Sequence, residues 1–209
     1  MNKALFFLTG LLFISGVRAE ASVNAEGTKY DVLSERVISA PPVVEFFSFY
    51  CPACYRYDTD MKVTDSVKKA LPEGVSLTRY HASFMGQLGN EMTRAWSVAI
   101  LMNMEDKIKP LMFDAVQKKH SVRAWRDIRN LFIAAGVEGR SFDAAWDSFA
   151  VQALTEKQNQ LAKSLRLSGI PAMFINGEYQ INPAGMNTDS VTAFVSDYTN
   201  TVRQLLSNQ

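Results

Sequence analysis

Cys51 and Cys54 are the only two cysteines in this 209-residue chain, and they enclose Pro52 and Ala53. Two thiols at this spacing can close into a disulfide and reopen by thiol–disulfide exchange. An apolar run typical of a buried strand precedes them at 43–49, and a helical pattern follows to about residue 70. Proline suits the first position of a helix. Cys51 would then lie at the helix N-terminus, where free N–H groups and the helix dipole stabilise a thiolate.

Two other interpretations of the cysteine pair are weaker. A structural zinc site needs four ligands, and the chain has no second cysteine pair and only two histidines, His81 and His120, which are not spaced as a pair. A purely structural disulfide here would close a very short loop and constrain the unfolded chain little. The sequence therefore favours a working redox pair that needs no metal and no cofactor.

The first 19 residues predict a secretory signal peptide. Lys3 supplies a positive start, residues 4–14 are apolar, and Val17-Arg18-Ala19 ends in the small residues that precede cleavage, which we expect after about Ala19. The apolar run is shorter than the roughly 20 residues of a membrane-spanning helix. We therefore expect a soluble exported protein, in a compartment where disulfides persist.

Composition sets broad limits on function. The chain is 47% hydrophobic and 21% charged, with a net charge of +1. These values are ordinary for a globular protein, and the near-zero charge does not favour binding to nucleic acid or to a charged membrane surface. The length suits one domain, or one domain with an insertion, and no feature requires a dimer.

The remaining pattern predicts strands at both ends of the chain and helices between them. Residues 30–38 could hold an edge strand, 75–81 alternate as a strand, and 172–175 and 178–181 flank Asn176-Gly177, a strong hairpin signal. From 88 to 167 the apolar spacing is helical, with a last helix expected around 155–167. One helical face includes Phe142, Trp146 and Phe149. A closing helix is expected over 188–206, capped by Thr188 or Asn187.

Glu45 and Pro171 are unusual for their positions. Glu45 interrupts the apolar strand, where a lone carboxylate is expensive unless it is paired or protonated. Pro171 starts a strand, and its bond to Ile170 could be cis, although the general frequency of cis is low. His81 and His120 are expected to be structural or surface residues.

Several separated motifs together resemble the bacterial periplasmic DsbA-type thiol:disulfide oxidoreductases. They are FFSFYCPAC at 46–54, LPEGV at 71–75, FMG at 84–86 and GIPAMFING at 169–177. The resemblance covers essentially the whole chain after the signal peptide. It implies an α/β fold, a thioredoxin-like mixed sheet with an inserted all-helical domain. The implied division is 20–86 and 156–209 for the thioredoxin-like domain and 87–155 for the insertion.

The resemblance also implies roles for individual residues. Cys51 looks like the exposed nucleophile and Cys54 like the buried resolving cysteine, while Pro171 matches a cis-proline that faces the disulfide. Glu45 matches a buried acid beneath the site, and Arg79 matches a position, usually lysine, that pairs with that acid. The positions that match the family's apolar substrate groove are Tyr57, Met61, Phe84, Met85 and Phe194.

Ala53 departs from the family pattern, because the best-known members carry histidine there. Without an imidazolium beside Cys51, we expect a less acidic thiol and a less oxidising disulfide than in the histidine form. The implied activity is donation of the Cys51–Cys54 disulfide to newly exported, reduced proteins. The implied partner is a DsbB-like, quinone-linked reoxidant of the inner membrane. A reductase or isomerase of the same superfamily, and a thiol-independent peptide-binding holdase, remain alternatives.

Overall fold

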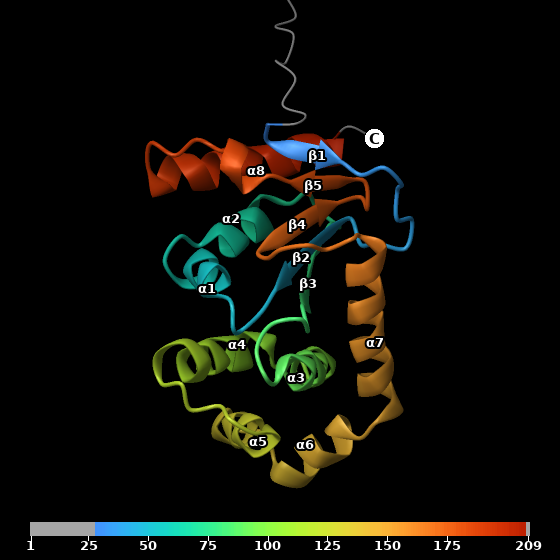
Figure 1. The fold of residues 1–209 in the computed structure, drawn as a ribbon, viewed down its shortest axis with the longest axis vertical. Coiled ribbons are helices and arrows are strands. Elements are labelled where there is room, and N and C mark those ends of the chain that lie inside the picture. The colour runs from blue at the N-terminus through green and yellow to red at the C-terminus, as the bar shows by residue number, and fades with distance from the viewer. Residues whose placement is uncertain (1–27, 208–209) are drawn as a thin grey trace, which may run out of the picture.

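The structure, a computed structural model, describes residues 28–207 (Figure 1). The predicted signal peptide, 1–19, lies outside the described residues. Among the helices of residues 28–207, none combines the length and apolar character needed to cross a bilayer.

Five strands form one sheet. They are β1 (Tyr30–Val32), β2 (Val43–Phe47), β3 (Leu77–His81), β4 (Ala172–Ile175) and β5 (Tyr179–Ile181). Residues 28–207 also form eight α-helices, a π-helical segment and a short 3-10 turn. The α-helices are α1 (Pro52–Thr59), α2 (Val63–Ala70), α3 (Gly89–Leu101), α4 (Glu105–Phe113), α5 (Trp125–Ala134), α6 (Gly139–Trp146), α7 (Phe149–Ser164) and α8 (Val191–Ser207). The π-helical segment is η1 (Asp114–Lys118), and the 3-10 turn is η2 (Pro183–Gly185).

The strand order is β1-β5-β4-β2-β3, and the sheet is mixed. β2 pairs in parallel with β3 and antiparallel with β4, so β2 lies inside the sheet. All five of its residues are buried, as its apolar sequence predicted. β4 and β5 form the predicted hairpin, in which Asn176 and Gly177 both have positive φ values, 54° and 62°. Such a turn matches the twist of paired strands.

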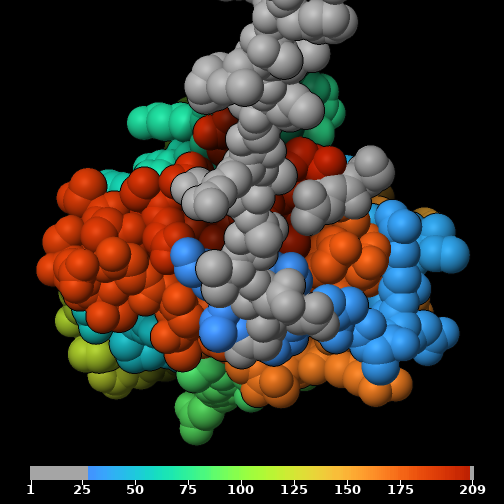
Figure 2. Space-filling model, turned by 90° about the horizontal axis from the view of Figure 1, so that it is seen from above, coloured from blue at the N-terminus to red at the C-terminus, as the bar shows by residue number. Residues whose placement is uncertain are grey.

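Alternation along β2 sends its side chains to two different cores. Val43 faces α2 and α8, where Val67 and Val202 are also buried. Val44 and Phe46 face the opposite side, where Leu161 of α7 covers the sheet. Seen from above in Figure 2, α8 (red) and the β1 segment (blue) lie side by side, and Lys29 joins Asp197 of α8 at 2.6 Å.

The inserted helices α3 to α6 form a layer below the sheet in Figure 1. Their core also includes Phe47 at the end of β2 and both cysteines. α7 runs between the two parts. Val151, near its start, packs in the helical core, whereas Leu161 packs on the sheet. The predicted boundary at 155 therefore falls inside one continuous helix, and the domain division remains a prediction.

Side chains of α3 and α7 cover the free edge of β3. Trp96 of α3 donates from Nε1 to the Arg79 carbonyl at 2.8 Å, and Gln158 of α7 accepts from the His81 N–H at 2.8 Å. An uncovered strand edge would offer these groups to another chain. The insertion is thus joined to the strand that carries Arg79.

Four local predictions were wrong. The helix after Cys54 does not run unbroken to Ala70: α1 ends at Thr59, and Lys62 takes a left-handed φ of 57° before α2 begins. α7 begins at Phe149 rather than near 155, because the Ser148 hydroxyl caps it by accepting from the Val151 N–H. Phe149 itself is 84% exposed and is not a core residue. Finally, Ser190 caps α8 by accepting from the Ala193 N–H, in place of Thr188 or Asn187.

Candidate active site

The cysteine pair lies where β2 delivers the chain to α1. Cys51 is the N-cap residue of α1, in extended conformation, and Pro52 occupies the first helical turn, as predicted. The first turn holds no acidic residue that would oppose a negative charge on Cys51. Ahead of the helix, the Cys51 N–H donates to the Ser48 carbonyl at 3.1 Å, which closes a tight turn over Ser48–Cys51.

Both cysteines are free thiols, and they differ sharply in acidity. The pKa of Cys51 is lowered to about 7, first by a hydrogen bond from the Cys54 side chain and then by the N–H groups of Cys54 and Ala53. The Cys54 N–H lies 3.1 Å from the Cys51 sulfur. Burial raises the pKa of Cys54, as does its hydrogen bond to Cys51. The arrangement therefore favours a thiolate on Cys51 and a thiol on Cys54.

Cys51 is not the exposed residue that we expected. Only 3% of it is exposed, almost the same as the 2% of Cys54. The segment before β4 covers it: the Cys51 sulfur lies 3.6 Å from the Ile170 carbonyl, and Ile170 packs against the same core. The Ile170–Pro171 peptide bond is cis, as the resemblance implied. Pro52 and Ala53, in contrast, are exposed.

Glu45 belongs to β2, and its side chain lies on the face of the sheet that α2 covers. It is 3% exposed and accepts from Thr64 at 3.0 Å and from Arg79 Nε at 2.7 Å. Burial raises the pKa of Glu45, and the nearby Arg79 opposes that rise. The pairing with Arg79 that the resemblance implied is therefore present.

Asp58 is a site residue that the sequence analysis missed. This α1 carboxylate is 5% exposed and lies 3.3 Å from Arg79 Nη2 and 3.0 Å from Lys109 Nζ. Glu45, Asp58, Arg79 and Lys109 thus form a cluster of two acids and two bases under the helix that carries the cysteines. Lys109 lies on α4, 51 positions away, so no local pattern could have revealed the contact.

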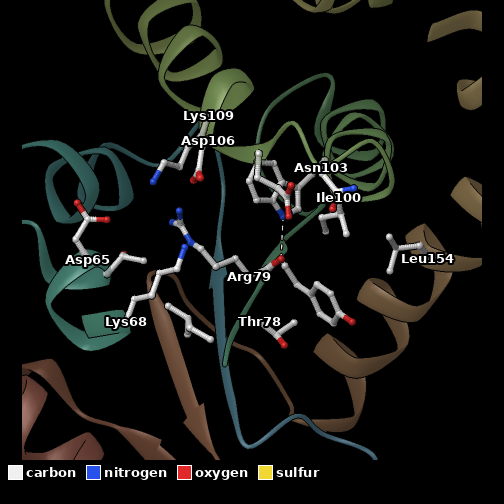
Figure 3. Close-up of a pocket in the computed structure, with 14 residues that line it drawn as sticks. Asp65, Lys68, Thr78, Arg79, Ile100, Asn103, Asp106, Lys109 and Leu154 are labelled. Carbon is white, nitrogen blue, oxygen red and sulfur yellow. Dashed lines mark hydrogen bonds between the residues drawn. The ribbon is translucent and has the colours of Figure 1, made fainter. Parts of the chain in front are cut away.

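A cavity of about 370 Å³ reaches this cluster from the side. Arg79 and Thr64, which both hydrogen-bond Glu45, contribute to its wall. In Figure 3, Arg79 of β3, Lys109 of α4 and Lys68 of α2 extend toward one another. Neither cysteine lines this cavity. Glu45 and Asp58 do not line it either, so the cavity meets the cluster at its basic side chains, Arg79 and Lys109.

Comparison with known proteins agrees with this geometry. A family model described as "DSBA-like thioredoxin domain" matches residues 42–199. The chain is 46% identical to the thiol:disulfide interchange protein DsbA of Salmonella typhimurium over 209 residues, all of both chains. It is 45% identical to that of Escherichia coli K12 over 206 residues, 98% of each chain.

The chain belongs to the DSBA-like thioredoxin family. Proteus mirabilis DsbA in complex with a non-covalently bound peptide, PWATCDS, superposes with a TM-score of 0.85 at 43% identity, covering 87% of this chain and 97% of that one. Salmonella SrgA gives a TM-score of 0.83 at 36% identity, over 86% and 100% of the two chains. The predicted thioredoxin-like fold is therefore confirmed, and so is the predicted class, a protein-disulfide oxidoreductase of the DsbA type.

The five positions that match the family's groove fall into two groups. Tyr57, Met61 and Phe194 pack together, with the rings of Tyr57 and Phe194 5.9 Å apart. Met85 packs instead on the helical core, and Phe84 is 57% exposed. A shared substrate groove stays a prediction.

His81 has the structural role that we predicted. It is 1% exposed, and burial lowers its pKa to about 3, so the ring is neutral. Its Nε2 accepts from the Phe49 N–H at 3.2 Å, which leaves Nδ1 as the donor to Thr93 Oγ1 at 2.8 Å. Among the described residues, no group of three His, Cys, Asp or Glu side chains is placed to hold a metal ion.

Proposed function

We propose that this protein oxidises exported proteins by donating the Cys51–Cys54 disulfide, with Cys51 as the attacked sulfur and Cys54 as its resolving partner. The observation that supports these roles is the unequal acidity of the two thiols at the start of α1. A sulfur that is stable as a thiolate is the better leaving group in exchange. The reduced form is thereby favoured, and the disulfide is given away.

The exchange proceeds in two steps. A substrate thiolate attacks the Cys51 sulfur, the Cys51–Cys54 bond breaks, and Cys54 leaves and takes up a proton. A second substrate thiolate then attacks the substrate sulfur of the mixed disulfide and releases Cys51 as a thiolate. The substrate loses two electrons and two thiol protons. The protein gains the two electrons; one proton is taken up by Cys54, and the other goes to solvent while Cys51 remains a thiolate.

Glu45 is the proposed proton carrier for Cys54. Burial raises the pKa of Glu45, which favours its protonated form, and the charge of Glu45 raises the pKa of Cys54. Both Glu45 oxygens already have partners, Thr64 and Arg79, so transfer to Cys54 would pass through water. Arg79 is the positioning residue that holds the acid.

Access to Cys51 requires the Ile170–Pro171 segment to exchange its contact for a contact with the substrate. The Ile170 carbonyl, now 3.6 Å from the Cys51 sulfur, would accept instead from a substrate N–H. Tyr57, Met61 and Phe194 offer an apolar surface for the substrate chain.

No cofactor takes part in these steps. We further propose a monomer, directed to the periplasm by the 1–19 signal peptide and reoxidised by a DsbB-like, quinone-linked membrane protein.

The potential of the cysteine pair is the measurement that tests this function. Equilibration with glutathione at pH 7 should give a value between about −120 mV, the established value for DsbA, and about −180 mV, that of protein disulfide isomerase. The reason is that Ala53 supplies no cation to stabilise the Cys51 thiolate, whereas the helix N-terminus still does. A value near −270 mV, where thioredoxin lies, would reassign the protein to the reductases.

Cys51→Ala separates the enzyme from a binding protein. The variant should lose oxidation of a reduced, unfolded substrate completely, because no mixed disulfide can form. Cys54→Ala, given a substrate that already carries a disulfide, should instead trap a mixed disulfide: the Cys51 thiolate attacks the substrate disulfide, one substrate thiolate leaves, and no Cys54 is present to resolve the product. Suppression of aggregation that survives in Cys51→Ala, with no loss of activity on exported substrates, would favour the thiol-independent holdase.

A further inference from the structure

The turn just before Cys51 depends on a side chain from the helical insertion. Ser48–Cys51 form the turn, and Phe49 is its first central residue, with no exposed surface. The polar groups of a central residue point out of such a turn and need other partners. The Phe49 N–H donates to His81 Nε2 at 3.2 Å, and the Phe49 carbonyl accepts from Gln117 Nε2 at 2.6 Å.

The carbonyl contact is the more consequential of the two. In a four-residue turn, the peptide between the two central residues can rotate as a unit, and its orientation distinguishes the common turn types. Here that peptide joins Phe49 to Tyr50. Gln117 holds the Phe49 carbonyl, and the Tyr50 N–H of the same peptide donates to Ser48 Oγ at 3.2 Å. The two contacts together give the peptide plane one orientation. The backbone of Tyr50 and Cys51, which starts the helix, follows from it.

The π-helical segment η1 brings Gln117 to this place. It follows α4 directly, and its wider turns are closed by bonds five residues apart, such as that from the Lys119 N–H to the Asp114 carbonyl at 3.0 Å. Phe113, the residue before η1, packs its ring 5.1 Å from that of Phe49. One short stretch of the insertion therefore holds both the side chain and the main chain of Phe49. Departures of this kind from the α-helix often accompany functional sites.

We propose that Gln117 is a positioning residue for thiol–disulfide exchange: by fixing the Phe49–Tyr50 peptide, it holds Cys51 where the N–H groups of α1 stabilise its thiolate. This inference rests on the proposed role of Cys51 as the attacked sulfur. In the disulfide form, the bond to Cys54 itself restrains Cys51. The reduced form lacks that restraint and relies more on Gln117.

Gln117→Leu tests the inference, because it keeps the bulk and removes the donor. The reduced protein should lose more stability than the oxidised protein, and the equilibrium with glutathione should shift roughly tenfold toward the protein disulfide. The Cys51 thiolate, followed by its ultraviolet absorbance, should titrate at higher pH. Equal destabilisation of both redox forms with an unchanged equilibrium would show that Gln117 only supports the fold, and would overturn the proposal.

Gln152→Leu is the matched control. Gln152, on α7, also donates its amide to a main-chain carbonyl, that of Asp147 at 3.4 Å, but it is exposed and far from Cys51 in the chain. This variant should leave both the equilibrium and the Cys51 titration unchanged. Shifts equal to those of Gln117→Leu would mean that the effect is general, and would also count against the proposal.

Gln117→Glu gives an independent test through pH. At pH 7 its carboxylate would face the Phe49 carbonyl as a second acceptor, and the glutathione equilibrium should shift at least as far as in Gln117→Leu. As the pH falls through the titration of the new carboxyl, its O–H restores the donor, and the difference from the unmodified protein should shrink. Wild-type behaviour at pH 7 would overturn the proposal. Loss of exchange in Cys51→Ala is a separate result, so failure of the proposed function remains distinguishable.

Discussion

Glu45 and Arg79 occupy directly paired positions on the parallel strands β2 and β3, and their side chains meet at 2.7 Å. The strand register therefore holds a buried base beside a buried acid without help from any loop. Asp58 and Lys109 complete the cluster from α1 and α4. The charge environment beneath the cysteines is thus set jointly by the sheet, the active-site helix and the helical insertion.

Glu45→Gln should slow exchange with a reduced peptide at pH 7 by about tenfold or more, because it keeps the shape of the side chain and removes the proton carrier. Stopped-flow kinetics would measure this. Thr64→Val is a suitable control, because it removes only the hydroxyl contact to Glu45. An unchanged rate in Glu45→Gln would leave Glu45 as a structural acid paired with Arg79.

The same variant has a predictable pH signature in stability. Burial raises the folded-state pKa of Glu45. Its contribution to the free energy of unfolding is therefore present below the ordinary carboxyl pKa and is lost as pH rises through the folded-state pKa. The stability of Glu45→Gln relative to the unmodified protein should therefore increase from pH 4 to pH 8 in urea unfolding experiments. A decrease over that range would show that the ion pair with Arg79 outweighs burial.

Ala53→His should make Cys51 more acidic and the disulfide more oxidising. The residue is exposed, so the change should be tolerated, and an imidazolium would stabilise the thiolate. Each unit by which the pKa of Cys51 falls below about 7 should raise the potential by about 30 mV. Thiolate absorbance and a glutathione equilibrium measure the two quantities. Ala53→Gln adds similar bulk without charge, and an equal shift in that variant would argue against the electrostatic explanation.

The lowered pKa of Cys51 also predicts how the stability of the reduced protein depends on pH. Its folded-state pKa is lowered to about 7, so the stabilisation is present above the ordinary thiol pKa and is lost as pH falls through about 7. Reduced protein should gain stability over reduced Cys51→Ala between pH 6 and pH 9. Parallel unfolding curves for the two proteins across this range would contradict the assigned acidity.

Asp58→Asn should destabilise the fold by about 3–5 kcal/mol, because it removes one charge from a buried ion pair and leaves Arg79 and Lys109 incompletely compensated. Lys109→Met should lower the free energy of unfolding by less, since Asp58 keeps its ion pair with Arg79. Urea unfolding measures both, and the double variant should show a coupling energy between the two positions. Lys107→Met, at an exposed position on the same helix, is the control. Additive losses would mean that the contact contributes little.

Gly86→Ala should destabilise the protein more than Gly74→Ala. Both glycines have positive φ values, 73° and 79°, so both variants carry the same backbone strain. At Gly86, however, an added Cβ would lie 2.4 Å from the Tyr50 ring, whereas nothing lies within 4 Å at Gly74. Tyr50 directly precedes Cys51, so Gly86→Ala should also change the reactivity of Cys51 toward iodoacetamide. Removing the ring with Tyr50→Ala should reduce the additional loss of stability caused by Gly86→Ala. If that loss is unchanged in the double variant, the clash with Tyr50 is excluded as its cause.

The sequence by itself determined the local features of this protein. The alternation of β2, the proline at the start of α1 and the Asn176-Gly177 hairpin each depend on neighbouring residues, which act through backbone geometry and periodicity. The cysteine pair at the start of a helix was readable for the same reason. The Glu45–Arg79 pair was anticipated through resemblance, since the two residues are far apart in the chain.

The tertiary structure alone decided which distant groups meet. Lys109, one of the two partners of Asp58, lies 51 residues away from it, and the partner of the Phe49 carbonyl lies 68 residues away, so no local spacing encodes either contact. The burial of Cys51 depends on Ile170, 119 residues later in the chain. Even the break between α1 and α2 rests on a lysine whose sequence context favours a continuous helix. Such contacts are set by how the insertion packs on the sheet, and packing is a property of the folded chain rather than of any segment.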